Sequence, residues 1–298
     1  MTGVLAATDY CAYCPTLCLH ACPVATAEAN DAVSPWGKMS LARWLANGSA
    51  AVTPETAAVL YKCTGCGACT AACRHAVDVG GTLREAREDA IGRGVVAYPP
   101  SLFRAPVEAP DDAVLPPGVS GAALYAAGFR SDFLAVARAC AARWASRSEV
   151  VLASAEDARC VRDIYPLYDV KVRPPVVLAA ERARQGPPLE GPVAWHEPCH
   201  FVRSPNADHA RVRENARRLA GGALVELRWH GDNATCCGGS AVYAATSPNG
   251  AREAARRILD NALLKGAKTL LTACEGCARH LGQAVEDRPI RVAFVGGA

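Results

Sequence analysis

The spacing of the cysteines constrains this chain more than any other feature of its sequence. Its fifteen cysteines include two runs of four before residue 75 and a group of five after residue 198. In the group of five, 36 residues separate the first cysteine from an adjacent pair, Gly238 follows the pair, and 36 residues separate the pair from a C-x2-C motif. Such regular intervals place thiolates around a metal ion or an iron–sulfur cluster. The five are Cys199, Cys236, Cys237, Cys274 and Cys277.

The two early runs have the spacing of ferredoxins. The second run reads C-x2-C-x2-C-x3-C, in which three close thiolates hold one [4Fe-4S] cube and the fourth binds another cube. The first run has one extra residue but keeps a proline, Pro23, after its last cysteine, where the second run has Arg74. This exchange rule predicts one cube on Cys11, Cys14, Cys18 and Cys73, and the other on Cys22, Cys63, Cys66 and Cys69. A pair of structural zinc sites is the weaker alternative, because zinc usually takes two separated ligand pairs.

Composition limits the compartment and the partners. The chain has 298 residues, 51% of them hydrophobic, which is enough for two domains. Its N-terminus lacks the features of a signal peptide, so we expect free thiols in a reducing cytoplasm rather than disulfides. No apolar run reaches the length of a spanning helix, so any membrane contact would come through a membrane-bound partner. A net charge of +3 without a basic block argues against nucleic-acid binding.

Periodicity predicts an α + α/β architecture. Residues 1–97 are expected to form a helical domain, because Pro35 is followed at helical spacing by Trp36, Met39, Leu41, Trp44 and Leu45, and Thr53 caps a second helix. The tryptophans and the methionine of this stripe are expected to pack in the core. Residues 98–120 contain six prolines, which predicts an extended linker and a domain boundary.

The remainder alternates between strands and helices. We expect strands at 193–196, 223–229, 269–273 and 291–295, and helices at 208–220, 250–264 and 274–281, which together form a parallel sheet. Cys199, Cys236 and Cys274 would then follow three successive strands. Ligands bind outside the carboxyl ends of such strands, so these residues are expected to converge on one pocket.

The two parts resemble known redox proteins. The first resembles the α-helical dicluster ferredoxins of heterodisulfide reductase C subunits and of anaerobic glycerol-3-phosphate and succinate dehydrogenases. The second, with the sequence WHEPCH at 195–200, is similar to the CCG domain of heterodisulfide reductase B subunits and of relatives in lactate and glycolate oxidation. The resemblance implies a C-like domain fused to a B-like domain, with a third cluster at the CCG cysteines. That cluster would be a noncubane [4Fe-4S] cluster, with zinc as the alternative.

An offset of 120 residues predicts a degenerate CCG repeat. Pro116 and Pro117 fall on the cysteine pair, while Ser154 and Asp157 fall on the C-x2-C motif. Residues 121–190 are therefore expected to form a half without ligands, and residues 191–298 the intact half. Cys140 and Cys160 match no ligand position and are expected to be small buried residues.

Three polar residues beside Cys199 are candidates for proton transfer, namely His196, Glu197 and His200. Orienting the loop or bonding cluster sulfurs is an equally acceptable role for them.

The resemblance implies an iron–sulfur electron-transfer subunit that relays electrons between a flavoprotein, two cubes and the CCG centre. A flavoprotein partner is expected because the chain has no G-x-G-x-x-G motif of its own. The terminal substrate would be a disulfide, thiol, quinone or further carrier. Two alternatives stay open: a docking or assembly subunit whose CCG site holds zinc, and the iron–sulfur subunit of a lactate or glycolate oxidase.

Overall fold

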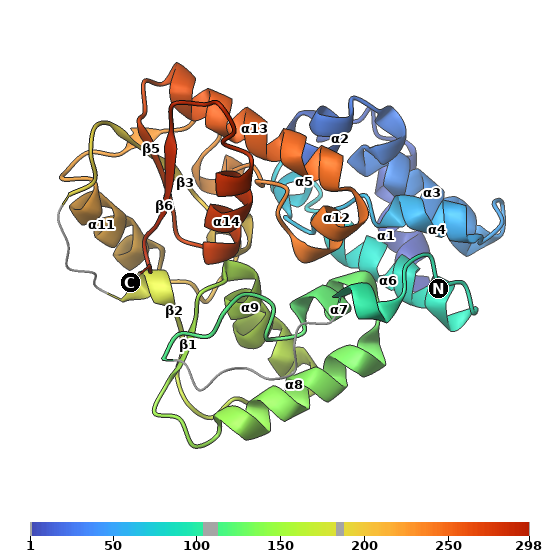
Figure 1. The fold of residues 1–298 in the computed structure, drawn as a ribbon. Helices are drawn as coiled ribbons and strands as arrows, with labels where there is room; N and C mark the ends of the chain where they lie inside the picture. The colour runs from blue at the N-terminus through green and yellow to red at the C-terminus, as the bar shows by residue number, and fades with distance from the viewer. Residues whose placement is uncertain (1, 104–112, 183–187, 298) are drawn as a thin grey trace.

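The computed structural model describes residues 2–103, 113–182 and 188–297. It has a helical N-terminal part and two parts that each contain a parallel sheet (Figure 1). The predicted α + α/β class is therefore confirmed. No helix in these ranges is long and apolar enough to cross a bilayer.

The N-terminal part contains α1 (Thr2–Ala12), α2 (Pro23–Glu28), α3 (Pro35–Asn47), α4 (Pro54–Leu60), α5 (Ala68–Ala71) and α6 (Val79–Gly92). Of these helices, α1, α3, α4 and α6 pack around one apolar cluster. The predicted helix signals operate here: Ser34 caps α3 before Pro35, and Thr53 forms a capping box at α4. Met39 is fully buried in this cluster, whereas Trp44, which was expected in the core, is 49% exposed.

The C-terminal sheet has the order β4-β3-β5-β6, with all strands parallel. Its strands are β3 (Val193–His196), β4 (Val225–Glu226), β5 (Thr269–Thr272) and β6 (Arg291–Phe294), and its long helices are α11 (His209–Leu219), α13 (Pro248–Leu264) and α14 (Glu275–Gln283). The strand expected at 223–229 is only two residues long. The chain leaves the ladder there, since the Arg228 amide donates to the Asn261 side chain instead.

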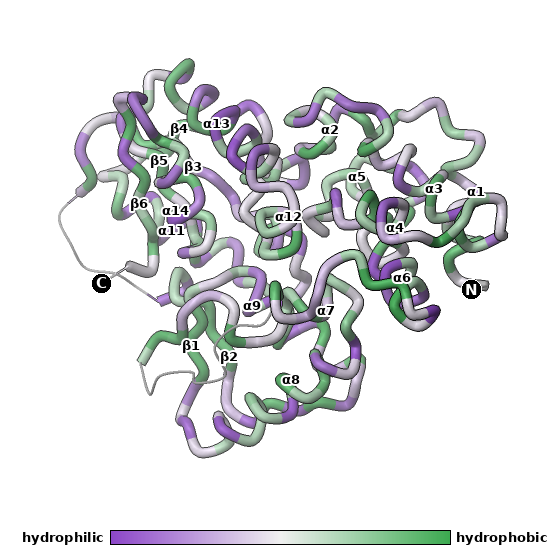
Figure 2. Tube along the Cα trace, turned by 45° about the vertical axis from the view of Figure 1, so that its right-hand side comes forward, coloured by the Kyte–Doolittle hydropathy of each residue, from purple (hydrophilic) through white to green (hydrophobic). Residues whose placement is uncertain are grey.

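The middle part repeats this order of elements without its cysteines. It contains α7 (Ala122–Ala127), α8 (Arg130–Trp144), β1 (Val150–Leu152), α9 (Ala155–Arg159) and β2 (Val176–Leu178). The C-terminal part has α12 (Ala241–Thr246), α13, β5, α14 and β6 in the same order. Both β1 and β2 consist of hydrophobic residues (Figure 2), and β1 is buried along its whole length.

The proline-rich segment is only partly a linker. Residues 104–112 lie outside the described ranges, but Pro100–Phe103 forms a 3-10 turn and Phe103 is buried. Leu115 is fully buried and forms a parallel bridge with Leu152 of β1. Where the segment is described, its apolar side chains Phe103 and Leu115 are therefore packed into the core.

Candidate metal centres

The five late cysteines line one pocket of about 290 Å³. Cys199 opens the short helix α10 (Cys199–Val202) directly after β3, and Cys274 caps α14, whose first turn carries Cys277. Cys236 and Cys237 lie in the loop before α12. The pocket thus lies beyond the carboxyl ends of β3 and β5, where an open parallel sheet places its ligands.

The thiols are held close to one another and to backbone donors. The sulfur atoms of Cys237 and Cys277 are 3.4 Å apart. The Gly238 amide donates to Cys236 Sγ at 3.3 Å, and the Ala155 amide donates to Cys274 Sγ at the same distance. Gly238 has φ +86°, and a Cβ there would lie 2.7 Å from the Ala251 carbonyl oxygen. Only glycine fits after the cysteine pair, which explains the third letter of the CCG motif.

Hydrogen bonds favour thiolates at two positions. The hydrogen bond from Cys277, with amide donors nearby, lowers the pKa of Cys274 to about 7 despite burial. Hydrogen bonds to Cys236 and Cys277 lower the pKa of Cys237 well below its usual value. Contact with Cys236, followed by burial, raises the pKa of Cys199. Because metals bind the thiolate, this donor set suits a thiolate-bound cluster, and cluster binding would release the remaining protons.

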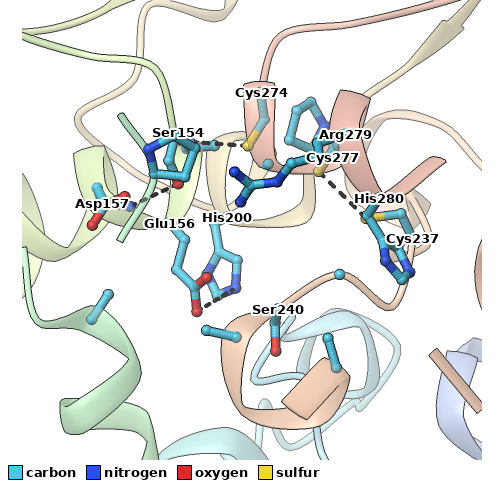
Figure 3. Close-up of a pocket in the computed structure, with 18 of the residues that line it drawn as sticks. Ser154, Glu156, Asp157, His200, Cys237, Ser240, Cys274, Cys277, Arg279 and His280 are labelled. Carbon is cyan, nitrogen blue, oxygen red and sulfur yellow. Dashed lines mark hydrogen bonds and ion pairs between the residues drawn. The ribbon is translucent and has the colours of Figure 1, made fainter. Parts of the chain in front are cut away.

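The middle part supplies the opposite wall of the pocket. Figure 3 shows Ser154 and Asp157 on one side of it and Cys277 and Cys237 on the other. Asp157 accepts hydrogen bonds from the Gly118 amide at 2.7 Å and the Ser120 amide at 3.0 Å, and from the Ser120 hydroxyl. This carboxylate is therefore occupied in holding its own loop.

The three proton-transfer candidates do not lie together in the pocket. Only His200 lines it. His196 is buried against the Thr272 hydroxyl, 3.0 Å from its Nδ1, and Glu197 pairs with Arg213 at 2.7 Å. Burial lowers the pKa of His196 to about 4, and burial with the charges of Arg159 and Arg203 lowers that of His200 to about 3. Both imidazoles are neutral at pH 7.

The pocket contains ionisable residues that the sequence did not predict. The Arg279 guanidinium projects into it, and Glu156 faces His200 (Figure 3). Burial, with the nearby Asp157 and Cys274, raises the pKa of Glu156 to about 8. No local signal marked Arg279, because a residue two positions after Cys277 lies on a different face of the helix.

The eight early cysteines surround two further cavities. Cys11 lies at the end of α1, and it lines one cavity with Cys14, Cys18 and Cys73. Cys22 caps α2 and lines the other with Cys63 and Cys66. Cys69 lines both cavities. The fifteen cysteines, all within the described residues, are free thiols, and Cys140 and Cys160 lie outside these three cavities.

A buried lysine accompanies the second of these cavities. Lys38 is 1% exposed, lines the cavity beside Cys22, and donates from Nζ to the Lys62 carbonyl at 2.5 Å. Burial raises the pKa of Cys22, and the charge of Lys38 opposes that rise. The lysine therefore supplies positive charge where thiolates gather, and the spacing of the cysteines gave no sign of it.

The ferredoxin-like part and the CCG pocket meet at a sulfur contact. Cys66 packs with Cys199 and Cys236 in one buried cluster. Its contact with the Cys236 thiol, followed by burial, raises the pKa of Cys66 well above its usual value. A predicted ligand of one site thus touches a predicted ligand of the other.

Comparison with family models matches both parts of the chain. Residues 7–77 match a 4Fe-4S dicluster domain and residues 193–282 match a cysteine-rich domain. The first match contains the eight early cysteines and the second contains the five late ones. Among curated proteins, none matches the chain significantly. The predicted pairing of a dicluster ferredoxin with a CCG domain is confirmed.

Proposed function

We propose that this chain relays electrons between a flavoprotein and the CCG pocket. Its two domains match a heterodisulfide reductase-like architecture. The domains indicate an iron–sulfur electron-transfer subunit. We further assign it to a cytoplasmic oxidoreductase complex. The relay between its centres is supported by one observation, the packing of Cys66 with Cys199 and Cys236 in one buried cluster. Two centres whose ligands touch are close enough to exchange electrons directly.

The proposed ligands divide into three sets. Bound iron–sulfur clusters would supply one-electron redox chemistry. Thiolates would hold them, and the buried Lys38 would offset negative charge at one of them. The sets are Cys11, Cys14, Cys18 and Cys73; Cys22, Cys63, Cys66 and Cys69; and Cys199, Cys236, Cys237, Cys274 and Cys277.

The CCG pocket is proposed as the place where electrons reach a terminal acceptor. Arg279 and Glu156 line it together with the five cysteines. A disulfide, thiol, quinone or further carrier is the proposed class. The opposite wall has no thiol, since Ser154 and Asp157 stand there, which favours a single redox centre in the pocket.

Metal analysis with electron paramagnetic resonance tests this function. Anaerobically purified protein should contain about twelve irons per chain, four for each of three clusters, and show three signals on reduction. Cys237→Ala should remove one signal and keep the two ferredoxin-like signals. Cys160→Ala, at a buried cysteine outside the pocket, should keep all three.

Three results would contradict the proposal. About eight irons with zinc would instead support the docking or assembly subunit. An unchanged spectrum in Cys237→Ala would remove the CCG pocket from the electron path. A co-purifying hydroxy-acid oxidase would move the chain to the lactate or glycolate class.

A further inference from the structure

One guanidinium joins three of the chain segments that carry cluster ligands. Arg203 follows α10, the short helix that begins at Cys199. Its Nη1 donates to the Cys66 carbonyl at 3.1 Å, and its Nη2 donates to the Asp232 carbonyl at 2.9 Å and the Ala234 carbonyl at 2.7 Å. Ala234 precedes the cysteine pair by two residues. Arg203 therefore bonds to the backbone on both sides of the Cys66–Cys236 contact.

The ferredoxin-like loop is shaped to receive this side chain. Gly67, next to Cys66, has φ +73°, and a Cβ there would lie 3.1 Å from Arg203 Cδ. Any other residue would be strained in this conformation and would crowd the arginine. The two loops thus approach each other over a glycine and are bonded through one side chain.

Arginine suits this role better than lysine. A guanidinium presents several donors in a rigid fork, whereas an ammonium group is a compact point charge on a flexible stem. Here the guanidinium donates to carbonyls on two domains at once. The described bonds of Arg203 include no carboxylate. The arrangement is consistent with alignment of the loops rather than with an ordinary surface ion pair.

We infer that Arg203 is a positioning residue that fixes the distance between the Cys66 and Cys236 sulfurs and so controls one-electron transfer between the two centres. This inference rests on the proposed function. The transfer oxidises one centre by one electron and reduces the other by one, and no bond forms or breaks. A flavoprotein, or dithionite in the test, supplies the electron.

The test measures magnetic interaction between the two centres in the complete, cluster-loaded chain. Partly reduced wild-type protein should show spin–spin splitting between a ferredoxin-type signal and the CCG signal. Arg203→Met should keep its iron content, lose that splitting, and slow the arrival of electrons at the CCG centre after mixing with dithionite. Arg203→Lys should show a reduced splitting, and it decides the matter if Arg203→Met does not retain its clusters.

A second arginine provides the matched control. The Arg162 guanidinium also donates to protein oxygens, namely the Val176 carbonyl and both oxygens of Glu181. These bonds lie within the middle part, and Arg162 is far in sequence from Cys66 and Cys236. Arg162→Met should lower stability and leave the splitting unchanged, which separates positioning from general destabilisation.

Three signals with an unchanged splitting in the loaded Arg203 variant would overturn the inference. So would a wild-type protein with three signals and no interaction between them. Absence of the third signal from wild-type protein would instead contradict the proposed function itself, so the two failures are distinguishable.

Discussion

At the scale of single residues, charge near the clusters is controlled by a few buried groups. Lys38 is the clearest of these, because its ammonium group is buried beside Cys22 and has only a carbonyl oxygen as its described bonding partner. Buried charges are usually paired with an opposite charge. Here thiolates and a reduced cluster would provide that opposite charge.

Lys38→Met should lower the reduction potential of the cube held by Cys22, Cys63, Cys66 and Cys69. Removing a positive charge disfavours the more negative, reduced form. Coulomb energy at a separation of several ångströms predicts a fall on the order of 50 to 100 mV. A potentiometric titration followed by electron paramagnetic resonance measures it. Lys62→Met is the control, because the Lys62 side chain pairs with Glu28; an equal shift in both variants would contradict a specific role for Lys38.

His196 predicts a pH dependence of stability. Its pKa is lowered to about 4 by burial, so the folded state holds the ring neutral while the unfolded state protonates near 6.5. The contribution of His196 to the free energy of unfolding is therefore greatest above pH 6.5, and it is lost as the pH falls toward 4. Its size is at most about 3 kcal/mol. Urea unfolding at several pH values should show a flatter acid slope for His196→Gln than for wild type, and parallel slopes would refute the assignment.

At the scale of elements, a carboxylate replaces a thiolate in the middle part. Asp157 occupies on α9 the position that Cys277 occupies on α14. Asp157 accepts hydrogen bonds from residues 118 and 120, and Cys277 contacts Cys237 in the CCG loop. The loop and the helix are thus joined without a metal. These bonds hold the loop that contains Gly118 and Ser120 against α9.

Asp157→Ala should destabilise the protein by about 3 kcal/mol, because it leaves buried donors of Gly118 and Ser120 without an acceptor. Denaturant unfolding of the loaded protein gives the value. Asp208→Ala, which removes only the cap of α11, should cost about 1 kcal/mol. If the two substitutions cost the same, Asp157 does not hold the loop as described.

Elements with strong local signals were predictable from sequence. The strand at 193–196 has the expected bounds, and α11 begins after its capping residue Asp208. The strand expected at 223–229 was too long, because a tertiary bond to Asn261 decides where it ends. Proline density predicted an extended segment, yet Phe103 and Leu115 are drawn into the core. Local pattern cannot report such distant partners.

At the scale of the whole molecule, the N-terminal helices and the middle part share one apolar cluster. Tyr61 belongs to that cluster and donates its hydroxyl to the Ala127 carbonyl at 3.0 Å. Arg87, on α6, donates to the carbonyls of Leu60 and Ala126. Helix α13 runs from the C-terminal sheet to α2 (Figure 1). The cysteine-bearing parts are therefore fixed against each other through buried contacts.

The sequence could predict which cysteines belong together but not how the sites meet. Spacing within each run is a local property, and it identified Cys63, Cys66 and Cys69 as neighbours. Contact of Cys66 with Cys236 depends on the docking of loops 170 residues apart. Arg203 gave no signal, since its partners are backbone carbonyls and carry no side-chain identity.

The meeting of Cys66 with Cys236 inside one polypeptide has a kinetic consequence. Separate electron carriers must meet by diffusion, so the rate of electron transfer between them falls in proportion to their concentration. A covalent tether replaces that search with a fixed effective molarity. Dilution would therefore slow electron exchange with separate donors and acceptors, while electron transfer between the two centres of this chain would keep its rate.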